Sequence, residues 1–532
     1  MKYRLAQKNC KFNNIAVVYP FTFQNPYYVL PPLTAEYVQA ALHSLGKATT
    51  LFDLRFEKSL PDLQSFDAIC LFGHPENSGQ YRNWAHTVIP TILAGAPESA
   101  AIIAGGMGFL DVSKAMTDYP QIDVVITGSP EIAISEIVQD HPLDSVTNLA
   151  LRTDTGFHET ERKVLPLPEN LFPNRMLRNP AYNYHMIGIK TDVVRTAVGC
   201  NYRCKFCFEY GKASDGSFLR WQGRSPQSIL SEIQTLDATI VGLIDDDLTT
   251  SMPMLDQLSD LLIEKGIKKS YISVGRIDHV LNAAATLDKM ERAGFLALSF
   301  GLESVQDRTL RMLGKGLTLQ KIELGLEALN KTNILIGGTF LLGSPGESEA
   351  EMMEILTFAR KWNLDSVGTN RIRIEENRDQ KAAAWKTAPA ITGEELASIK
   401  RKIKYGQRTP FRILLSFCKL YRHKGMPFDP AYILIQMMET YTKGTFIHRV
   451  RLISRGFAIL QKWLRLSYVR KVNRLIAFVL YPFLKFATIV FERIDNHLGI
   501  ATNLLPLWFN WYKKTVYNRQ TIAAQVHSAS NN

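Results

Sequence analysis

Short apolar runs alternate with helix-like stretches in the first part of the chain. Five runs have the length and composition of buried strands: IAVVYP (15–20), ATTLFDL (48–54), FDAICLFG (66–73), AAIIAGG (100–106) and DVVITG (123–128). The stretch TAEYVQAALHSLG (34–46) instead repeats apolar side chains at helical spacing. Strands that alternate with helices predict crossover connections and a mostly parallel α/β sheet.

A second alternating series follows a stretch rich in proline and asparagine. Its candidate strands are residues 192–198, 238–244, 270–277, 296–300, 333–343 and 366–374. Six β/α units in series predict a full or partial barrel. Chemistry in such barrels gathers at the carboxyl ends of the strands, so the residues directly after each strand are the candidates for a site.

These patterns predict four parts: an α/β domain over residues 1–145, a connector over 146–190, a barrel over 191–385 and a helical region over 386–532. A length of 532 residues fits two or three domains. With 46% hydrophobic and 21% charged residues, the composition is that of an ordinary globular protein. The 33 glycines and 24 prolines show no repeating period, which excludes collagen-like chains.

Three of the six cysteines stand in one short loop directly after the first candidate barrel strand. The loop reads C-N-Y-R-C-K-F-C and contains Cys200, Cys204 and Cys207. Six cysteines are too few for a disulfide scaffold, and this spacing indicates metal ligands in a reducing compartment. Three thiolates can hold three irons of a 4Fe-4S cluster and leave the fourth iron open. Zinc is the alternative, but closed zinc sites want four ligands, and no matching fourth residue is near in the sequence.

The cysteine loop resembles that of the radical SAM superfamily, whose CxxxCxφC motif stands here as Cys200, Cys204, Phe206 and Cys207. The resemblance implies a partial (β/α)6 TIM barrel in which the open iron chelates S-adenosyl-L-methionine. One electron from the cluster then cleaves this cofactor to methionine and a 5'-deoxyadenosyl radical. It also implies an electron donor, such as a reductase, a flavodoxin or a ferredoxin, and places Phe206 beside the adenine.

Residues after the later strands extend the resemblance. Asp245, Asp246 and Asp247 stand where the family has an acidic motif that accepts hydrogen bonds from the amino group of S-adenosylmethionine. Arg276 follows the third strand and could pair with a carboxylate, and Glu303 and Ser304 are similar to the family's GxES motif. The alternatives are a solvated acidic turn or helix cap for the aspartates and an ordinary ion pair for Arg276. No further side chain is singled out as catalytic.

The order of domains and motifs resembles the cobalamin-binding subclass of this superfamily. The resemblance implies a Rossmann-like (flavodoxin-like) cobalamin-binding-type domain at the N-terminus. Gly73, His74, Gly105 and Gly106 follow two of its strands and are the candidate cobalamin contacts. The alternatives are a tight turn for the glycines and a structural role for the histidine. The DxHxxG motif of other cobalamin proteins is absent, and the subclass's GEGE turn is replaced by GSPE (128–131).

Charge is distributed unevenly along the chain. The total is +12, but the first 400 residues carry 40 Lys/Arg and 46 Asp/Glu, a net of −6, whereas residues 401–532 carry 22 and 4, a net of +18. The acid-free run 448–477 interleaves basic and apolar residues, which predicts an amphipathic helix on anionic lipid. Residues 475–491 are apolar but include Pro482 and Lys485, so we expect peripheral contact rather than a span. Residues 504–514 (LLPLWFNWYKK) place four aromatic side chains beside two lysines, a composition typical of segments at a membrane–water interface.

Two other roles for the basic region remain open. It could form a helical cap over the barrel, or it could bind RNA. RNA binding is the less favoured of the two. The radical SAM enzymes that act on tRNA, the methylthiotransferases, have a pattern of three cluster cysteines in the N-terminal domain, whereas this chain has only Cys10 and Cys70 there.

These patterns together predict where the protein acts and on what. The N-terminus lacks the apolar core of a secretory signal, which predicts a cytoplasmic protein, in contact with the inner face of the membrane. We expect a radical SAM enzyme that methylates or oxidatively modifies an unactivated carbon of a small molecule, with a lipid or isoprenoid as one class. The alternatives are a cobalamin-free radical SAM enzyme and a membrane- or RNA-binding protein with a structural or sensory cluster.

Overall fold

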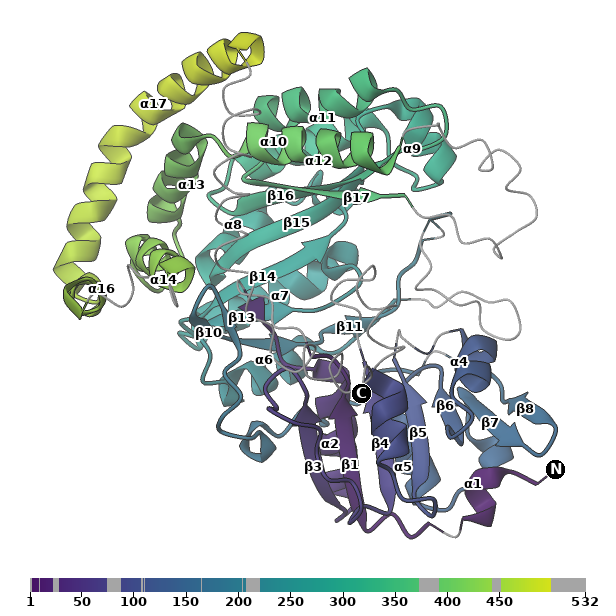
Figure 1. Ribbon diagram of the computed structural model, residues 1–532. Coiled ribbons are helices and arrows are strands. Elements are labelled where there is room, and N and C mark those ends of the chain that lie inside the picture. Colours follow the sequence, from purple (N-terminus) through teal and green to yellow (C-terminus); the bar gives the residue numbers. More distant parts are fainter. Residues whose placement is uncertain are drawn as a thin grey trace. The chain divides into compact units, whose positions relative to one another are not determined.

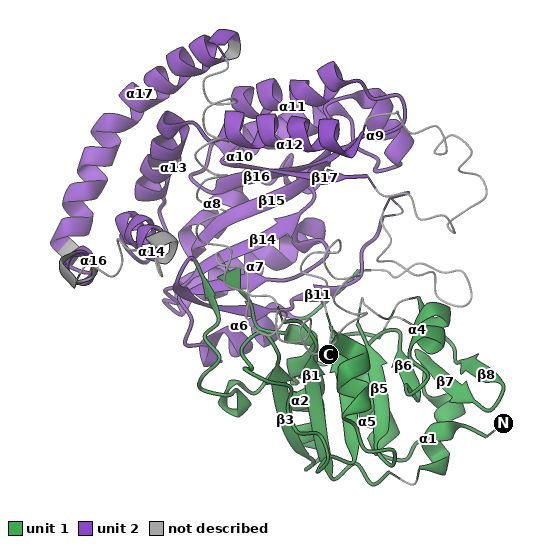
Figure 2. Ribbon diagram, viewed as in Figure 1, with its two compact units in different colours: residues 1–186, 209–224, 519–532 green, residues 187–208, 225–518 purple. Residues whose placement is uncertain are grey.

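The computed structural model describes residues 2–498 except 9, 23–27, 74–87, 107–108, 110, 164, 203, 207–220, 373–391 and 443–450. The chain divides into two compact units (Figure 2). The first contains residues 1–186, 209–224 and 519–532, and the second contains residues 187–208 and 225–518.

A parallel sheet forms the body of the first unit, as its apolar runs predict. Its parallel strands are β1 (Asn14–Tyr19), β3 (Ala48–Asp53), β4 (Ala68–Phe72), β5 (Ala101–Gly105) and β6 (Val124–Ile126). They lie in the order β3-β1-β4-β5-β6, which is the flavodoxin-like arrangement. The order of strands reverses beside β1, and ligands of such sheets bind beyond the carboxyl ends of the strands at this point.

Helices cover both faces of this sheet, because its strands are apolar on both sides (Figure 1). α2 (Leu33–Ser44) and α5 (Pro130–Val138) pack on one face, and α4 (Val112–Asp118) packs on the other. The short elements of this unit are α1 (Arg4–Gln7), β2 (Tyr28–Val29), β9 (His185–Met186) and β12 (Gln222–Gly223).

An antiparallel hairpin extends the same sheet. β7 (Leu149–Thr153) pairs with β6, and β8 (Gly156–Glu159) pairs with β7. This hairpin lies within the range that the sequence suggests as a connector. It was not recognisable as sheet because its outer strand is mostly exposed and lacks a buried apolar run.

The second unit contains a six-stranded parallel sheet of the partial-barrel type. Its strands are β10 (Ile189–Val194), β13 (Ile240–Leu243), β14 (Ser270–Gly275), β15 (Phe295–Glu303), β16 (Leu335–Leu342) and β17 (Ser366–Arg371). They pair in sequence order, each parallel to the next. The predicted (β/α)6 partial barrel is therefore confirmed.

Helices follow each of the first five barrel strands, with two of them after β15. These helices are α6 (Pro226–Thr235), α7 (Met252–Glu264), α8 (Ala284–Ala293), α9 (Asp307–Leu313), α10 (Leu319–Asn330) and α11 (Glu349–Lys361). Since all connections return the chain to the same end of the sheet, the carboxyl ends of the strands form one edge. The short strand β11 (Ala197–Val198) follows β10 at this edge.

Further helices follow the last barrel strand, as the sequence predicts. They are α12 (Gly393–Gln407), α13 (Pro410–Arg422), α14 (Pro430–Thr442), α16 (Arg451–Leu464) and α17 (Ser467–Leu498). Leu420 of α13 and Ile433 of α14 join a buried cluster with Ile189 and Leu296, which begin barrel strands. α13 and α14 therefore cover the amino ends of the strands, opposite the cysteine loop. α17 runs along the outer side of α13 (Figure 1).

Candidate radical cluster site

The cysteine loop begins at the carboxyl edge of the barrel sheet. Gly199 turns the chain out of β11 with a φ of 78°, a conformation that favours glycine. Cys200 and Cys204 follow it and are half-buried. The backbone N–H of Lys205 donates to the carbonyl of Leu313 at 3.0 Å, which ties the loop to the end of α9. Cys207, the third predicted ligand, lies outside the described residues.

The described cysteines lie beside positive charge. The Arg276 Nη1 atom is 3.9 Å from the Cys204 sulfur. Burial raises the pKa of the Cys204 thiol, while the charges of Lys315 and Arg276 act against this rise. Burial also raises the pKa of Cys200 to about 11. Iron binding at this loop must therefore displace protons from the thiols, and nearby cations offset the negative charge of a thiolate-ligated cluster.

Arg276 is held in place by three groups. Its side chain bonds to both carboxylate oxygens of Asp278, at 3.1 Å each, and to the carbonyl of Lys315 at 2.8 Å. Its guanidinium also lies 3.4 Å from the centre of the Tyr202 ring. The ion pair that the sequence left as an alternative for Arg276 is thus present. Its contact with a cofactor carboxylate stays a prediction.

A buried ion pair occupies the end of β15. The Lys315 Nζ atom lies 2.6 Å from the Glu303 Oε1 atom, and both side chains are 8% exposed. Glu303 has a φ of 65°, which is uncommon for a side chain other than glycine. Gly301 leaves the room for this pair, because a Cβ atom there would lie 2.5 Å from both charged atoms. The Lys315 ammonium is also 5.8 Å from the centre of the Phe206 ring.

The three aspartates after β13 have different environments. Asp245 is buried and accepts hydrogen bonds from the backbone N–H groups of Thr196 and Ala197, at 2.7 and 2.8 Å. Burial raises the pKa of Asp245 to about 6, although these bonds act in the opposite direction. Asp246 is the exposed member of the three. Asp245 thus orders the segment that enters the cysteine loop, and its contact with a cofactor stays a prediction.

Asp247, the third aspartate of the predicted acidic motif, is also buried. It accepts hydrogen bonds from the hydroxyls of Thr249 and Thr250, and the ring of His279 lies 3.5 Å away. Burial raises the pKa of this carboxyl, but the bonds from His279 and the two threonines outweigh burial and hold the pKa below its usual range. Asp247 therefore fixes the turn after β13.

Ser304 and Glu347 order two further turns at this edge. The Ser304 hydroxyl accepts a hydrogen bond from the Gln306 N–H at 3.1 Å, which supports the start of α9. Glu347 accepts from the N–H groups of Gly343 and Ser344 at 2.9 and 3.0 Å. Burial raises the pKa of Glu347 to about 7, against the effect of these two bonds. No observation tests whether Ser304 contacts a cofactor.

Lys315 and His279 are among the contributors to the site that sequence reasoning missed. Lys315 is the cation that pairs with Glu303, and its signal was a lysine between two glycines with φ values of 64° and 74°. His279 contacts the Tyr202 hydroxyl at 2.6 Å. The sequence did not single out His279, because a histidine near the end of a strand is common. Only the tertiary packing brings this ring to the cysteine loop.

The predicted cobalamin contacts lie in the first unit. Gly73 and Gly105 lie side by side, with the N–H of Gly73 3.4 Å from the carbonyl of Gly105. Gly106 has a φ of 85°, and a Cβ atom there would lie 2.4 Å from the carbonyl oxygen of Gly73. Gly106 is therefore required by its close approach to the backbone of Gly73. Whether these glycines also contact cobalamin stays a prediction. His74 lies outside the described residues.

Comparisons with known proteins agree with this geometry. Residues 194–359 match the radical SAM superfamily. The chain is 25% identical over 329 residues to an uncharacterised methyltransferase of Pyrococcus horikoshii, covering 59% of this chain and 68% of that protein. It is also 25% identical over 340 residues to an anaerobic magnesium-protoporphyrin IX monomethyl ester cyclase of Synechocystis sp., covering 59% and 64%. The chain thus spans about two thirds of these relatives.

Solved structures share the fold. A structure of the radical S-adenosylmethionine methyltransferase TsrM from Kitasatospora setae has a TM-score of 0.55 at 16% identity, over 68% of this chain and 72% of that one. A structure of the cobalamin-dependent S-adenosylmethionine radical enzyme OxsB has a TM-score of 0.54 at 13% identity, over 93% and 82%. The latter match covers both units of the present fold.

The barrel match contains the cysteine loop and every strand-end residue described above, from Cys200 to Glu347. We therefore identify residues 194–359 as a domain of the radical SAM superfamily and the chain as a radical SAM enzyme.

Proposed function

We propose that this enzyme uses a 4Fe-4S cluster, S-adenosylmethionine and cobalamin to methylate or oxidatively modify an unactivated carbon. The observation that carries the proposal is the cysteine loop at the carboxyl edge of the barrel, with Arg276 and Lys315 beside Cys204. When bound there, the cluster and S-adenosylmethionine supply a 5'-deoxyadenosyl radical, at the cost of one electron from a reductase, a flavodoxin or a ferredoxin.

The residues of this chain fit such a cluster. Cys200 and Cys204 are half-buried thiols on one short loop, and the donor set is completed in sequence by Cys207. Arg276 is positioned by Asp278 and Tyr202, so its charge is fixed beside the loop before any cofactor binds. A fixed charge of this kind stabilises a negative cluster without further reorganisation.

Cobalamin is supported by the fold of the first unit. Its β3-β1-β4-β5-β6 order places a switch point beside β1, where parallel sheets of this kind bind ligands. The OxsB match, which spans 93% of the chain, comes from a structure with aqua-cobalamin bound. The described glycines at this edge have a structural explanation, so cobalamin uptake needs a direct test.

The class of reaction follows from the relatives. One is named an uncharacterised methyltransferase, and another is named an anaerobic magnesium-protoporphyrin IX monomethyl ester cyclase. Methyl transfer and oxidative cyclisation are therefore the two reactions to test, on a small-molecule or lipid substrate.

Anaerobic reconstitution tests the cluster. Iron and sulfide should yield a 4Fe-4S spectrum, and reduction with S-adenosylmethionine should release 5'-deoxyadenosine. The Cys204→Ala variant should lose both signals. Cys418→Ala is the matched control, because Cys418 is a buried free cysteine on α13 at the other end of the barrel. Retention of both signals by Cys204→Ala would refute the assignment.

Corrinoid binding distinguishes the remaining alternatives. Purified protein incubated with hydroxocobalamin should retain about one corrinoid per chain after gel filtration. An intact cluster that forms 5'-deoxyadenosine without retained corrinoid would indicate a cobalamin-free radical enzyme. An intact cluster that never cleaves S-adenosylmethionine would indicate a structural or sensory cluster.

A further inference from the structure

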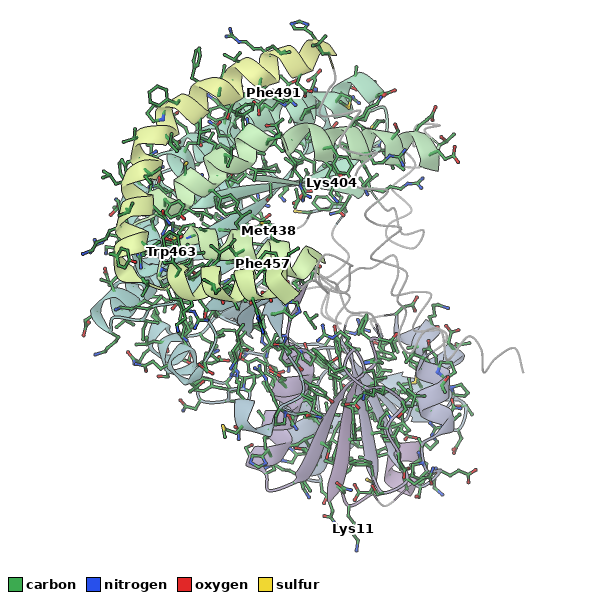
Figure 3. All side chains as sticks on the ribbon, turned by 60° about the vertical axis from the view of Figure 1, so that its left-hand side comes forward. Lys11, Lys404, Met438, Phe457, Trp463 and Phe491 are labelled. Atoms are coloured by element: carbon green, nitrogen blue, oxygen red, sulfur yellow. The ribbon has the colours of Figure 1, made fainter. Side chains whose placement is uncertain are left out.

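The outer side of α17 is an uncovered apolar face. Along this helix, the side chains that point away from the barrel are apolar over five turns (Figure 3). Phe486 is 70% exposed and Phe483 is 69% exposed. We call this surface the outer face; its other exposed apolar members are Val472, Leu475, Ile476, Val479, Leu480, Ile489 and Val490.

The helix before α17 extends the outer face. α16 is strongly amphipathic and exposes Ile459 and Trp463, while Phe457 and Leu464 are buried. Soluble monomers rarely expose a continuous apolar patch larger than about 300 to 600 Å². The members of the outer face run from Val472 to Val490, about 28 Å at 1.5 Å per residue, and the exposed side chains of α16 add to them. The outer face is therefore a binding surface.

The inner side of α17 is fixed to the barrel. The Arg412 guanidinium lies 2.7 and 2.9 Å from the carboxylate of Glu492, and Arg360 lies 2.6 Å from Asp495. All four side chains are buried. Residues Tyr468–Asp495 are long and apolar enough to cross a membrane, but only by length and composition. Because the inner side carries these ion pairs and packs on α13, the helix is held parallel to a surface rather than across it.

Basic groups border the outer face. Lys471 and Arg493 stand near its two ends, and the chain has no acidic residue between Glu439 and Glu492. The Arg422 guanidinium lies 5.4 Å from the ring of Phe478, an exposed residue beside the outer face.

A small polar cavity lies on the same border, between α13 and α17. Its volume is about 80 Å³, and its lining includes the basic side chains of Lys331, Arg412, Lys419, Arg422 and Lys485. Arg412 is paired with Glu492 and Lys419 with Asp365. An apolar stripe with basic groups along its edge is the arrangement that binds an interface carrying negative charge.

We propose that α16 and α17 dock the enzyme on a bilayer that contains anionic phospholipids. The outer face enters the boundary between headgroups and acyl chains, while the bordering lysines and arginines contact headgroup phosphates. α17 lies in the plane of the membrane, and the barrel stays in the aqueous phase. Trp463, at the end of α16, lies at the level of the headgroups, where tryptophan is enriched.

Co-flotation of the full-length, cluster-loaded enzyme with vesicles tests the proposal. One set of vesicles contains phosphatidylcholine and phosphatidylglycerol, and the other contains phosphatidylcholine alone. We expect the enzyme to float with the anionic vesicles, and added salt to weaken this binding. Phe486→Glu should lower the bound fraction about tenfold, because a charge at the centre of the outer face opposes its insertion.

Leu324→Glu is the matched control. Leu324 is 49% exposed on α10, away from the outer face, so its variant should bind as the wild type does. A Lys485→Gln/Arg422→Gln variant should weaken binding to anionic vesicles only. Both readouts are independent of catalysis, so they stand or fall separately from the proposed reaction.

Three results would overturn the proposal. Equal flotation of Phe486→Glu and wild type would place the contact elsewhere, such as in residues 504–514. Equal binding to both kinds of vesicle would remove the role of the basic border. A stable dimer by light scattering, together with no flotation, would assign the outer face to a second copy of the chain.

Discussion

The Glu303–Lys315 pair gives the sharpest test of how the site is built. The Glu303→Gln substitution keeps the shape of the side chain but removes its charge. The Lys315 ammonium then remains 8% exposed without its carboxylate. Breaking a buried ion pair by removing one partner costs about 3 to 5 kcal/mol. We expect Glu303→Gln to lower the free energy of unfolding by about 3 kcal/mol, at the lower end of this range, because the amide oxygen can still accept a hydrogen bond from Lys315.

The expected loss of stability comes from the burial of Glu303 and Lys315 and not from the short distance between their charged atoms. Lys190 and Asp237 provide the comparison, because their charged atoms are 2.7 Å apart but their side chains are 64% and 94% exposed. Solvent screens such a pair, so Asp237→Asn should leave the stability nearly unchanged. The double variant Glu303→Gln/Lys315→Met should recover most of the stability that Glu303→Gln loses, since it removes the unpaired charge.

Urea-induced unfolding of the apo-protein, followed by circular dichroism and tryptophan fluorescence, measures these differences. A loss for Glu303→Gln no larger than that for Asp237→Asn would refute the reasoning. If that result came with weaker binding of S-adenosylmethionine, Glu303 would serve the cofactor alone, as the family resemblance implies. Loss of stability with unchanged cofactor binding would assign Glu303 to the ion pair alone.

Three further predictions follow from other buried charges. Asp245→Asn should lower the free energy of unfolding by about 2 kcal/mol, because an amide accepts hydrogen bonds from the N–H groups of Thr196 and Ala197 less well than a carboxylate does. Since these bonds order the segment that enters the cysteine loop, the variant should also bind less iron per chain after reconstitution. Glu347 has a pKa raised by burial to about 7, above the ordinary value of 4.5, so its contribution to stability is complete below pH 4.5 and is lost as pH rises through 7. Unfolding at pH 5 and pH 8 should show Glu347→Gln less sensitive to pH than wild type, by about 3 kcal/mol at most, and equal slopes would contradict this. Arg412→Met leaves the Glu492 carboxylate buried and unpaired, so hydrogen exchange should rise in α17 but not in β14; uniform exchange in both would show that the pair does not hold the helix.

Much of the fold was predictable because it rests on local apolar patterns. The expected runs 15–20 and 100–106 became β1 and β5, and the runs 270–277 and 333–343 became β14 and β16, each within a few residues. Buried parallel strands need apolar side chains on both faces, and this requirement is visible in the sequence. The hairpin of β7 and β8 was not visible, because one edge strand is mostly exposed and has no such requirement.

The site was predictable only where residue spacing sets it. The loop of Cys200 and Cys204 is local, and its sequence alone suggested a cluster. The partners of Arg276 and Glu303 depend on contacts made elsewhere in the chain. Lys315 reaches Glu303 only because of the course of the chain after β15 and the missing side chain at Gly301. The spacing of residues along the sequence therefore does not predict this contact.

The amino-acid sequence by itself determined the alternation of strands and helices, the cluster loop and the concentration of positive charge after residue 400, since each depends on neighbouring residues. The tertiary structure decided which charges are buried and paired. It set Arg276 and Lys315 beside Cys204, and it fixed one side of α17 to the barrel through Glu492 and Asp495. The same packing left the opposite side of α17 apolar and exposed, because a helix held on one side by buried ion pairs cannot turn its other side inward.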